Sequence, residues 1–186
     1  SSCSPAYFIE LLRAAAALKE RLPAARMRFM VIGGGKLEVQ LKALAARLGI
    51  SDMVTFTGFR ANAAALMGAM DIYAQPSLNE AMGRAPLEAQ AMGLPVIVSR
   101  VCGLPDVISE GKTGFSVPPE NPSALAAALE RLILSPKLRE RMGNEARTWA
   151  LAADETGFTR FGPEKMNAQL LTLYGTALGS RQKNAR

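Results

Sequence analysis

The chain has 186 residues, 49% of them hydrophobic, and a net charge of +6, which suits one globular domain with a substantial core. It has no histidine and two cysteines, so a Ser-His-Asp triad is excluded, and a zinc site or a disulfide framework is not expected. No apolar run reaches the roughly 18 residues of a transmembrane helix, and the first residues do not form a signal peptide. We therefore expect a cytoplasmic protein.

Along the chain, apolar periodicity and Gly or Pro stops predict helices that alternate with strands. Helices are expected over residues 5–21, 36–48, 61–70, 86–92, 121–134, 135–142 and 161–178, with a shorter helical segment over 104–110. Strands are expected over residues 27–32, 53–57, 71–75, 95–98 and 114–117. This alternation predicts the α/β class, with a single doubly wound, Rossmann-like parallel sheet.

The predicted domain covers residues 1–160 and is followed by a C-terminal helix and basic tail over residues 161–186. Residues 149–157 are expected to form a loose connection between these parts.

Two carboxylates, Glu80 and Glu88, bracket the turn between the strand at 71–75 and the helix at 86–92. Pro86 suits the first position of a helix, which would place Glu88 in the first helical turn. Small ligands bind at such turns of open α/β sheets. Free amides at the helix start attract phosphate, whereas carboxylates accept hydrogen bonds from sugar hydroxyls. The turn therefore fits a nucleotide sugar, with the diphosphate on the amides and a sugar on each glutamate. The alternative is that Glu88 only stabilises its own helix and Glu80 is a solvated loop residue.

The glutamates lie in a long motif that runs from Pro76 to Ile97. It reads Pro76-Ser77-Leu-Asn-Glu80-Ala-Met-Gly83-Arg-Ala-Pro-Leu-Glu88-Ala-Gln-Ala-Met-Gly93-Leu-Pro95-Val-Ile97. This stretch resembles the Glu-x7-Glu motif of group 1, or family 4, retaining glycosyltransferases of the GT-B fold, and residues 27–147 resemble their C-terminal donor-binding domain. The resemblance implies half of a GT-B fold, with Glu80 on the donor sugar and Glu88 on the donor ribose.

Two glycine turns and one arginine are further candidates. The resemblance implies that Gly33 and Gly35 line the nucleotide cleft and that the turn at residues 58–60 lies against the base. Lys36 and Arg84 either face the diphosphate or point to solvent. Glu80 is the catalytic candidate, and the donor-binding candidates are Glu88, Gly83, Arg84, Ala85, Leu87, Gly33, Gly35, Lys36, Phe59 and Arg60.

By the same resemblance, the protein transfers a hexose from a nucleoside diphosphate sugar with retention of configuration, and uses no metal or other cofactor. The family's domain normally begins with a strand and a Gly-Arg and Lys-Gly loop whose cations stabilise the departing diphosphate. This sequence contains neither these elements nor the N-terminal acceptor-binding domain. We therefore expect the isolated chain to be inactive, as part of a two-domain enzyme.

The sequence has three alternative interpretations. The main alternative is a non-catalytic nucleotide-sugar-binding or scaffold module left by truncation. A sugar-nucleotide epimerase is disfavoured by the lack of histidine. Nucleic-acid binding is not expected, since the basic residues are scattered and do not alternate with aromatic ones. Peripheral contact with the inner face of a membrane is compatible with the basic tail.

Overall fold

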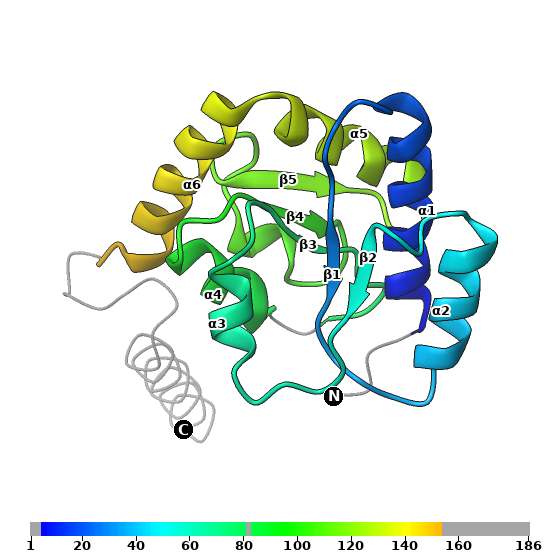
Figure 1. The fold of residues 1–186 in the computed structure, drawn as a ribbon. Helices are drawn as coiled ribbons and strands as arrows, with labels where there is room; N and C mark the ends of the chain where they lie inside the picture. Colours follow the sequence, from blue (N-terminus) through cyan, green and yellow to red (C-terminus); the bar gives the residue numbers. More distant parts are fainter. Residues whose placement is uncertain (1–4, 81–82, 154–186) are drawn as a thin grey trace, which may run out of the picture.

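The computed structural model describes residues 5–80 and 83–153, in which helices alternate with parallel strands (Figure 1). The helices are α1 (Pro5–Arg21), α2 (Glu38–Arg47), α3 (Ala63–Met67), α4 (Arg84–Ala91), α5 (Pro122–Leu134) and α6 (Pro136–Leu151), with a 3-10 turn η1 (Pro105–Val107). The strands are β1 (Phe29–Val31), β2 (Val54–Phe56), β3 (Tyr73–Gln75), β4 (Val96–Ser99) and β5 (Gly114–Val117). The predicted α/β class with parallel strands is confirmed.

The strands form two hydrogen-bonded groups. β1 pairs with β2, with Val31 opposite Phe56. The second group has the order β3-β4-β5, with Tyr73 opposite Val96 and Val96 opposite Gly114. The sequence predicted a single continuous sheet. The strands instead form two separate groups, because β1 and β3 do not pair with each other.

Helices cover both faces of β4, the middle strand of its group. Ile97 belongs to a hydrophobic cluster that includes residues of α1, α2 and α5. Val96 and Val98 point the other way, into a cluster with Met67 of α3 and Ala89 of α4. Successive side chains of a strand face opposite sides, so a strand buried on both faces is apolar at every position. The domain thus has helix, sheet and helix layers.

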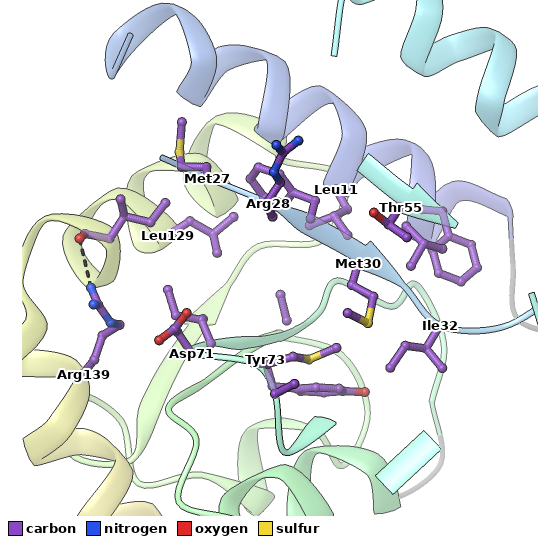
Figure 2. Close-up of a pocket in the computed structure, with 18 of the residues that line it drawn as sticks. Leu11, Met27, Arg28, Met30, Ile32, Thr55, Asp71, Tyr73, Leu129 and Arg139 are labelled. Carbon is purple, nitrogen blue, oxygen red and sulfur yellow. Dashed lines mark hydrogen bonds between the residues drawn. The ribbon is translucent and has the colours of Figure 1, made fainter. Parts of the chain in front are cut away.

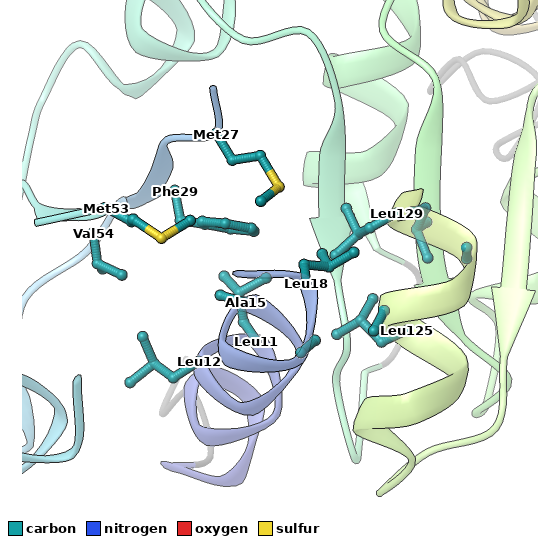
Figure 3. Close-up of a cluster of buried hydrophobic side chains, with 14 of the residues drawn as sticks. Leu11, Leu12, Ala15, Leu18, Met27, Phe29, Met53, Val54, Leu125 and Leu129 are labelled. Atoms are coloured by element: carbon teal, nitrogen blue, oxygen red, sulfur yellow. The ribbon is translucent and has the colours of Figure 1, made fainter. Parts of the chain in front are cut away.

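Helix α1 connects the two groups of strands on one face. Its Leu12 and Leu18 are fully buried. They belong to the same cluster as Phe29 of β1 and as Leu125 and Leu129 of α5 (Figure 3). Full burial of one leucine side chain contributes roughly 1.5–3 kcal/mol to the hydrophobic stabilisation of the fold.

Helix α6 is longer than the sequence predicted. It continues through Gly143 to Leu151, so the expected end at residue 142 was wrong, and residues 149–151 are helical rather than a loose connection. A Cβ on Gly143 would lie 2.1 Å from the carbonyl oxygen of Gly93, which follows α4. Glycine is needed here for close packing rather than for a helix end. The predicted helix over 161–178 and the basic tail lie outside the described residues.

Candidate functional site

The predicted site residues lie in the loops that follow β1, β2 and β3 and in the first two turns of α4. After β1 and β2, the amide of Gly33 donates a 3.1 Å hydrogen bond to the carbonyl oxygen of Gly58. A Cβ on Gly34 would lie 2.9 Å from the amide nitrogen of Phe59. The two turns therefore touch through backbone atoms, which brings the candidates of residues 33–36 close to those of residues 58–60.

Glu80 is held by a side chain of β3. The amide nitrogen Nε2 of Gln75 donates to Oε2 of Glu80 over 2.9 Å, and the Tyr73 hydroxyl donates to Oε1 of Gln75 over 2.9 Å. Gln75 is buried and Glu80 is half-buried. A carboxylate that accepts a hydrogen bond from a buried amide is fixed in direction more firmly than a solvated loop residue. The structure therefore disfavours the reading of Glu80 as a free surface residue.

Helix α4 starts earlier than the sequence predicted. It begins at Arg84, after Gly83 in the left-handed region with φ of +67°. Pro86 is therefore the third helical residue and Glu88 the fifth, so the prediction that Glu88 lies in the first turn was wrong. Pro86 is tolerated there because the first four amides of a helix have no partner within the helix. Glu88 is exposed and lies one turn along α4.

Gly83 is required by its surroundings. A Cβ at this position would lie 2.4 Å from Cδ2 of Leu104, in a conformation that side chains rarely adopt. The glycine therefore lets the loop turn sharply into α4 with its backbone against the core.

The helices that start at these loops lack side-chain caps. Within the described ranges, the N-cap residues Leu37, Asn62 and Gly83 make no side-chain hydrogen bond to the first amides of α2, α3 and α4. In contrast, Asn121 caps α5 through the amide of Ala124, at 2.9 Å, and Ser135 caps α6 through the amide of Leu138, at 3.3 Å. Uncapped helix starts present free amides and a partial positive charge, which suit an anionic ligand.

Exposed cations surround the three loops. Lys36, Arg60 and Arg84 are all exposed. In the described part of the chain none of them takes part in an ion pair, since the pairs join Lys19 to Asp52, Arg21 to Glu130 and Lys42 to Glu38. The side chain of Phe59 is 85% exposed, whereas Ala85 and Leu87 are half-buried. Among the described residues, no hydrogen bond or ion pair joins the glycine turns at 33–36 and 58–60 to the loop that carries Glu80.

The sequence did not predict the roles of three residues near the site. Tyr73 and Gln75 position Glu80, and the signal for them was a polar pair at alternate positions of an otherwise apolar strand. Gln90 is fully buried in α4 and donates to the carbonyl oxygen of Val107 over 2.7 Å, which ties α4 to η1. A single polar residue in a predicted helix does not indicate which distant backbone group it will bond.

A cavity of about 450 Å³ lies elsewhere, between β1 and β3 (Figure 2). None of the predicted site residues lines it. Tyr73 connects the cavity to the candidate site, because it lines the cavity and also donates to Gln75.

Two further properties concern the described residues only. They contain no group of three or more His, Cys, Asp or Glu side chains that could hold a metal ion. None of their helices combines the length and the hydropathy that crossing a bilayer requires.

Comparison with known proteins agrees with these features. Residues 6–149 match the family described as glycosyl transferases group 1. The chain belongs to this family. It is 38% identical over 177 residues to the D-inositol 3-phosphate glycosyltransferase of Actinosynnema mirum, a match that covers 90% of this chain and 40% of the relative. The family resemblance and the GT-B assignment drawn from the sequence are thereby confirmed.

Solved structures of glycosyltransferases have the same fold. WaaG, a glycosyltransferase involved in lipopolysaccharide biosynthesis, is 30% identical with a TM-score of 0.71, over 78% of this chain and 39% of that one. HepE of Anabaena, solved in complex with UDP and glucose, is 25% identical with a TM-score of 0.73, over 88% of this chain and 44% of that one. This member of the family thus spans less than half the length of each of these three proteins.

Proposed function

We propose that the chain is the donor-binding domain of a retaining hexosyltransferase that uses a nucleoside diphosphate sugar. Glu80 would orient the transferred sugar, and Glu88 would accept hydrogen bonds from the ribose hydroxyls. The observation that carries the proposal is the hydrogen bond that fixes Glu80 at the end of β3, beside the uncapped start of α4. The complex of HepE with UDP and glucose supports a donor of this class.

The diphosphate would bind at the start of α4. The amides of Gly83, Arg84 and Ala85 have no partner within the helix, whereas Pro86 has no amide hydrogen and Leu87, the fourth helical residue, already donates to the helix backbone. Arg84 and Lys36 would add positive charge. Fixed donors aimed at a departing phosphate stabilise the charge that develops as the glycosidic bond breaks. The acceptor hydroxyl would attack the anomeric carbon from the face that the diphosphate leaves, which retains the configuration.

The rest of the longer protein would bind the acceptor. The chain covers 40% of the length of the inositol phosphate glycosyltransferase it matches, so a second domain of similar size is part of the proposal. We propose that this chain alone binds the donor but transfers little sugar. A position at the inner face of a membrane is a further part of the proposal, supported by the net charge of +6, which would attract the chain to anionic lipids.

Calorimetry on two glutamine variants tests the proposed roles. The chain is titrated with UDP, GDP and ADP, and then with the glucose conjugate of the base that binds best. Loss of a hydrogen bond to a charged group costs about 1.5–3 kcal/mol, so Glu88→Gln should weaken both the nucleotide and its glucose conjugate roughly 10- to 100-fold. Glu80→Gln should weaken only the glucose conjugate, because Glu80 is assigned to the sugar.

Glu140→Gln is the matched control, since Glu140 is exposed on α6, away from the three loops. It should bind every ligand as the unmodified chain does. If neither Glu80→Gln nor Glu88→Gln changes the affinity for any ligand, the assignment of the donor site is wrong.

A further inference from the structure

The segment that follows β4 supports the segment that carries the proposed donor site. Three contacts join residues 102–107 to residues 79–90, namely those of Asn79 with Cys102, of Gly83 with Leu104 and of Gln90 with Val107. The first and the last are hydrogen bonds of 3.6 Å and 2.7 Å, near the two ends of residues 79–90. The middle one is a packing contact at the start of α4, where the proposed function places the diphosphate.

Leu104 makes this middle contact directly with the backbone of Gly83. It is fully buried and belongs to the same hydrophobic cluster as Val98 of β4 and Ala89 of α4. A Cβ on Gly83 would overlap with Cδ2 of Leu104, so no side chain lies between the two residues. Protein interiors are close-packed, so the δ carbons of Leu104 decide where the Gly83 backbone can lie.

The backbone on either side of Leu104 is held by hydrogen bonds. The Val101 amide donates to the carbonyl oxygen of Ser99, at the end of β4, over 2.9 Å. The Leu104 amide donates to Val101 over 3.1 Å, and the Leu104 carbonyl oxygen accepts from the Val107 amide over 3.3 Å. Pro105 further restricts the chain, because its ring fixes φ. Leu104 is therefore anchored to the end of a buried strand.

The position of Gly83 affects every free amide at the start of α4. The amides of Gly83, Arg84 and Ala85 have no partner within the helix. They can bind one diphosphate together only if they point to the same place, because a hydrogen bond weakens steeply when its donor is out of line. Gly83 is the first of the three, so a shift of its backbone moves the peptide groups that carry the next two amides.

We propose that Leu104 is a positioning residue for the diphosphate of the donor. Its side chain keeps the Gly83 backbone in place and thereby keeps the three free amides directed at the phosphates. Leu104 is fully buried, so it acts through Gly83 and not by contact with the ligand. The inference rests on the proposed function, because it requires that the start of α4 binds the diphosphate.

A positioning role predicts a loss of affinity that is specific for phosphate. The turns proposed for the nucleotide cleft and the base, at residues 33–36 and 58–60, follow β1 and β2, which form the other group of strands. A nucleoside would therefore bind independently of Leu104. If Leu104 only stabilised the fold, its replacement would weaken the nucleoside and the nucleoside diphosphate alike.

Two substitutions of Leu104 test this role in the full chain. Leu104→Val removes both δ carbons at the loss of one methylene group, so the fold should persist. Leu104→Met keeps an atom at the δ position and nearly the same volume. Leu125→Val is the matched control, because Leu125 is also fully buried but belongs to the cluster on the other face of β4. Thermal unfolding confirms that each variant is folded.

NMR titration, which detects weak binding, measures the affinities for UDP, GDP and ADP and for their nucleosides. Leu104→Val should weaken the diphosphate that binds best roughly 3- to 10-fold, and its nucleoside less than about twofold. Leu104→Met and Leu125→Val should bind both ligands as the unmodified chain does.

A second measurement uses the unmodified chain alone. Added inorganic pyrophosphate should shift the δ-methyl resonances of Leu104, through its contact with Gly83, and should leave those of Leu125 unchanged. This readout holds even if Leu104→Val does not fold.

Several results would overturn the proposal. Equal losses for diphosphate and nucleoside in Leu104→Val, no loss for either, or unshifted Leu104 methyl resonances would exclude the positioning role. The same selective loss in Leu125→Val would assign the effect to core packing in general. If the unmodified chain binds none of the three diphosphates, the proposed function fails as well. If it binds one of them and only the Leu104 results are negative, the positioning role alone is wrong.

Discussion

Gln75 donates a 2.9 Å hydrogen bond to Glu80, so a buried side chain of β3 orients the carboxylate of the following loop. Tyr73, on the same strand, in turn donates to Gln75. Glu80 is therefore oriented before any ligand arrives. Preorganisation of this kind reduces the conformational cost of binding.

Gln75→Met should weaken binding of a nucleotide sugar without weakening the nucleotide alone. The variant keeps the length of the side chain but cannot donate to Glu80. Loss of one such hydrogen bond, worth about 0.5–1.5 kcal/mol, should lower the affinity for the glucose conjugate roughly 2- to 10-fold in calorimetry. Gln40→Met, at an exposed position of α2, is the control. An equal loss for the nucleotide and its conjugate would mean that Gln75 acts on the fold and not through Glu80.

Gly83→Ala should destabilise the domain by backbone strain and by steric overlap. The positive φ costs about 1–2 kcal/mol, and the contact with Leu104 should add a similar amount. Gly49→Ala separates the two effects, because Gly49 has the same φ of +67° and open space around it. Gly35→Ala, which has neither feature, should change the free energy of unfolding by less than about 0.5 kcal/mol. Urea denaturation of the three variants measures this order, and equal stability of the Gly83 and Gly49 variants would refute the overlap.

Gln90→Leu should lower the free energy of unfolding by about 1–3 kcal/mol. The variant leaves the Val107 carbonyl without the 2.7 Å hydrogen bond that joins α4 to η1. Leucine is close to glutamine in size, so the loss of stability would come from the unpaired Val107 carbonyl and not from a cavity. Gln40→Leu on the exposed face of α2 is the matched control in chemical denaturation. A Gln90 variant as stable as this control would show that the bond contributes nothing.

Glu10→Gln should stabilise the domain at neutral pH and not at pH 4. Burial raises the pKa of the Glu10 carboxyl above its ordinary value of 4.5, against opposing effects of the Glu120 and Asn121 amides and of Arg13. The folded state therefore binds the proton more tightly than the unfolded state. Stability contributed by the protonated carboxyl is present below pH 4.5 and is lost as pH rises through the folded pKa.

Thermal unfolding of the unmodified chain and of Glu10→Gln across this pH range measures the difference. The advantage of the variant should grow as pH rises from 4 toward neutral. Glu140→Gln, exposed on α6, should show no such trend. A difference between Glu10→Gln and the unmodified chain that stays constant with pH would contradict the link to the buried carboxyl.

Local sequence determined the elements, because each depends on residues close together in the chain. The apolar run and the stop before Pro23 set α1 at the predicted bounds, and Asn121 and Ser135 start α5 and α6 as caps. The positions of Glu80 and Glu88 indicated the candidate loop, and the resemblance of the motif around them indicated the family.

Tertiary structure decided what depends on residues far apart in the chain. Gly143 continues α6 instead of ending it, because it packs against Gly93. The packing of α4 against η1 decides that the buried Gln90 donates to the carbonyl of Val107, 17 residues along the chain, and β1 and β3 stay unpaired although neither strand's own sequence indicates this. Periodicity and capping report on neighbours within a few residues, whereas close packing and strand pairing are fixed only when distant segments meet.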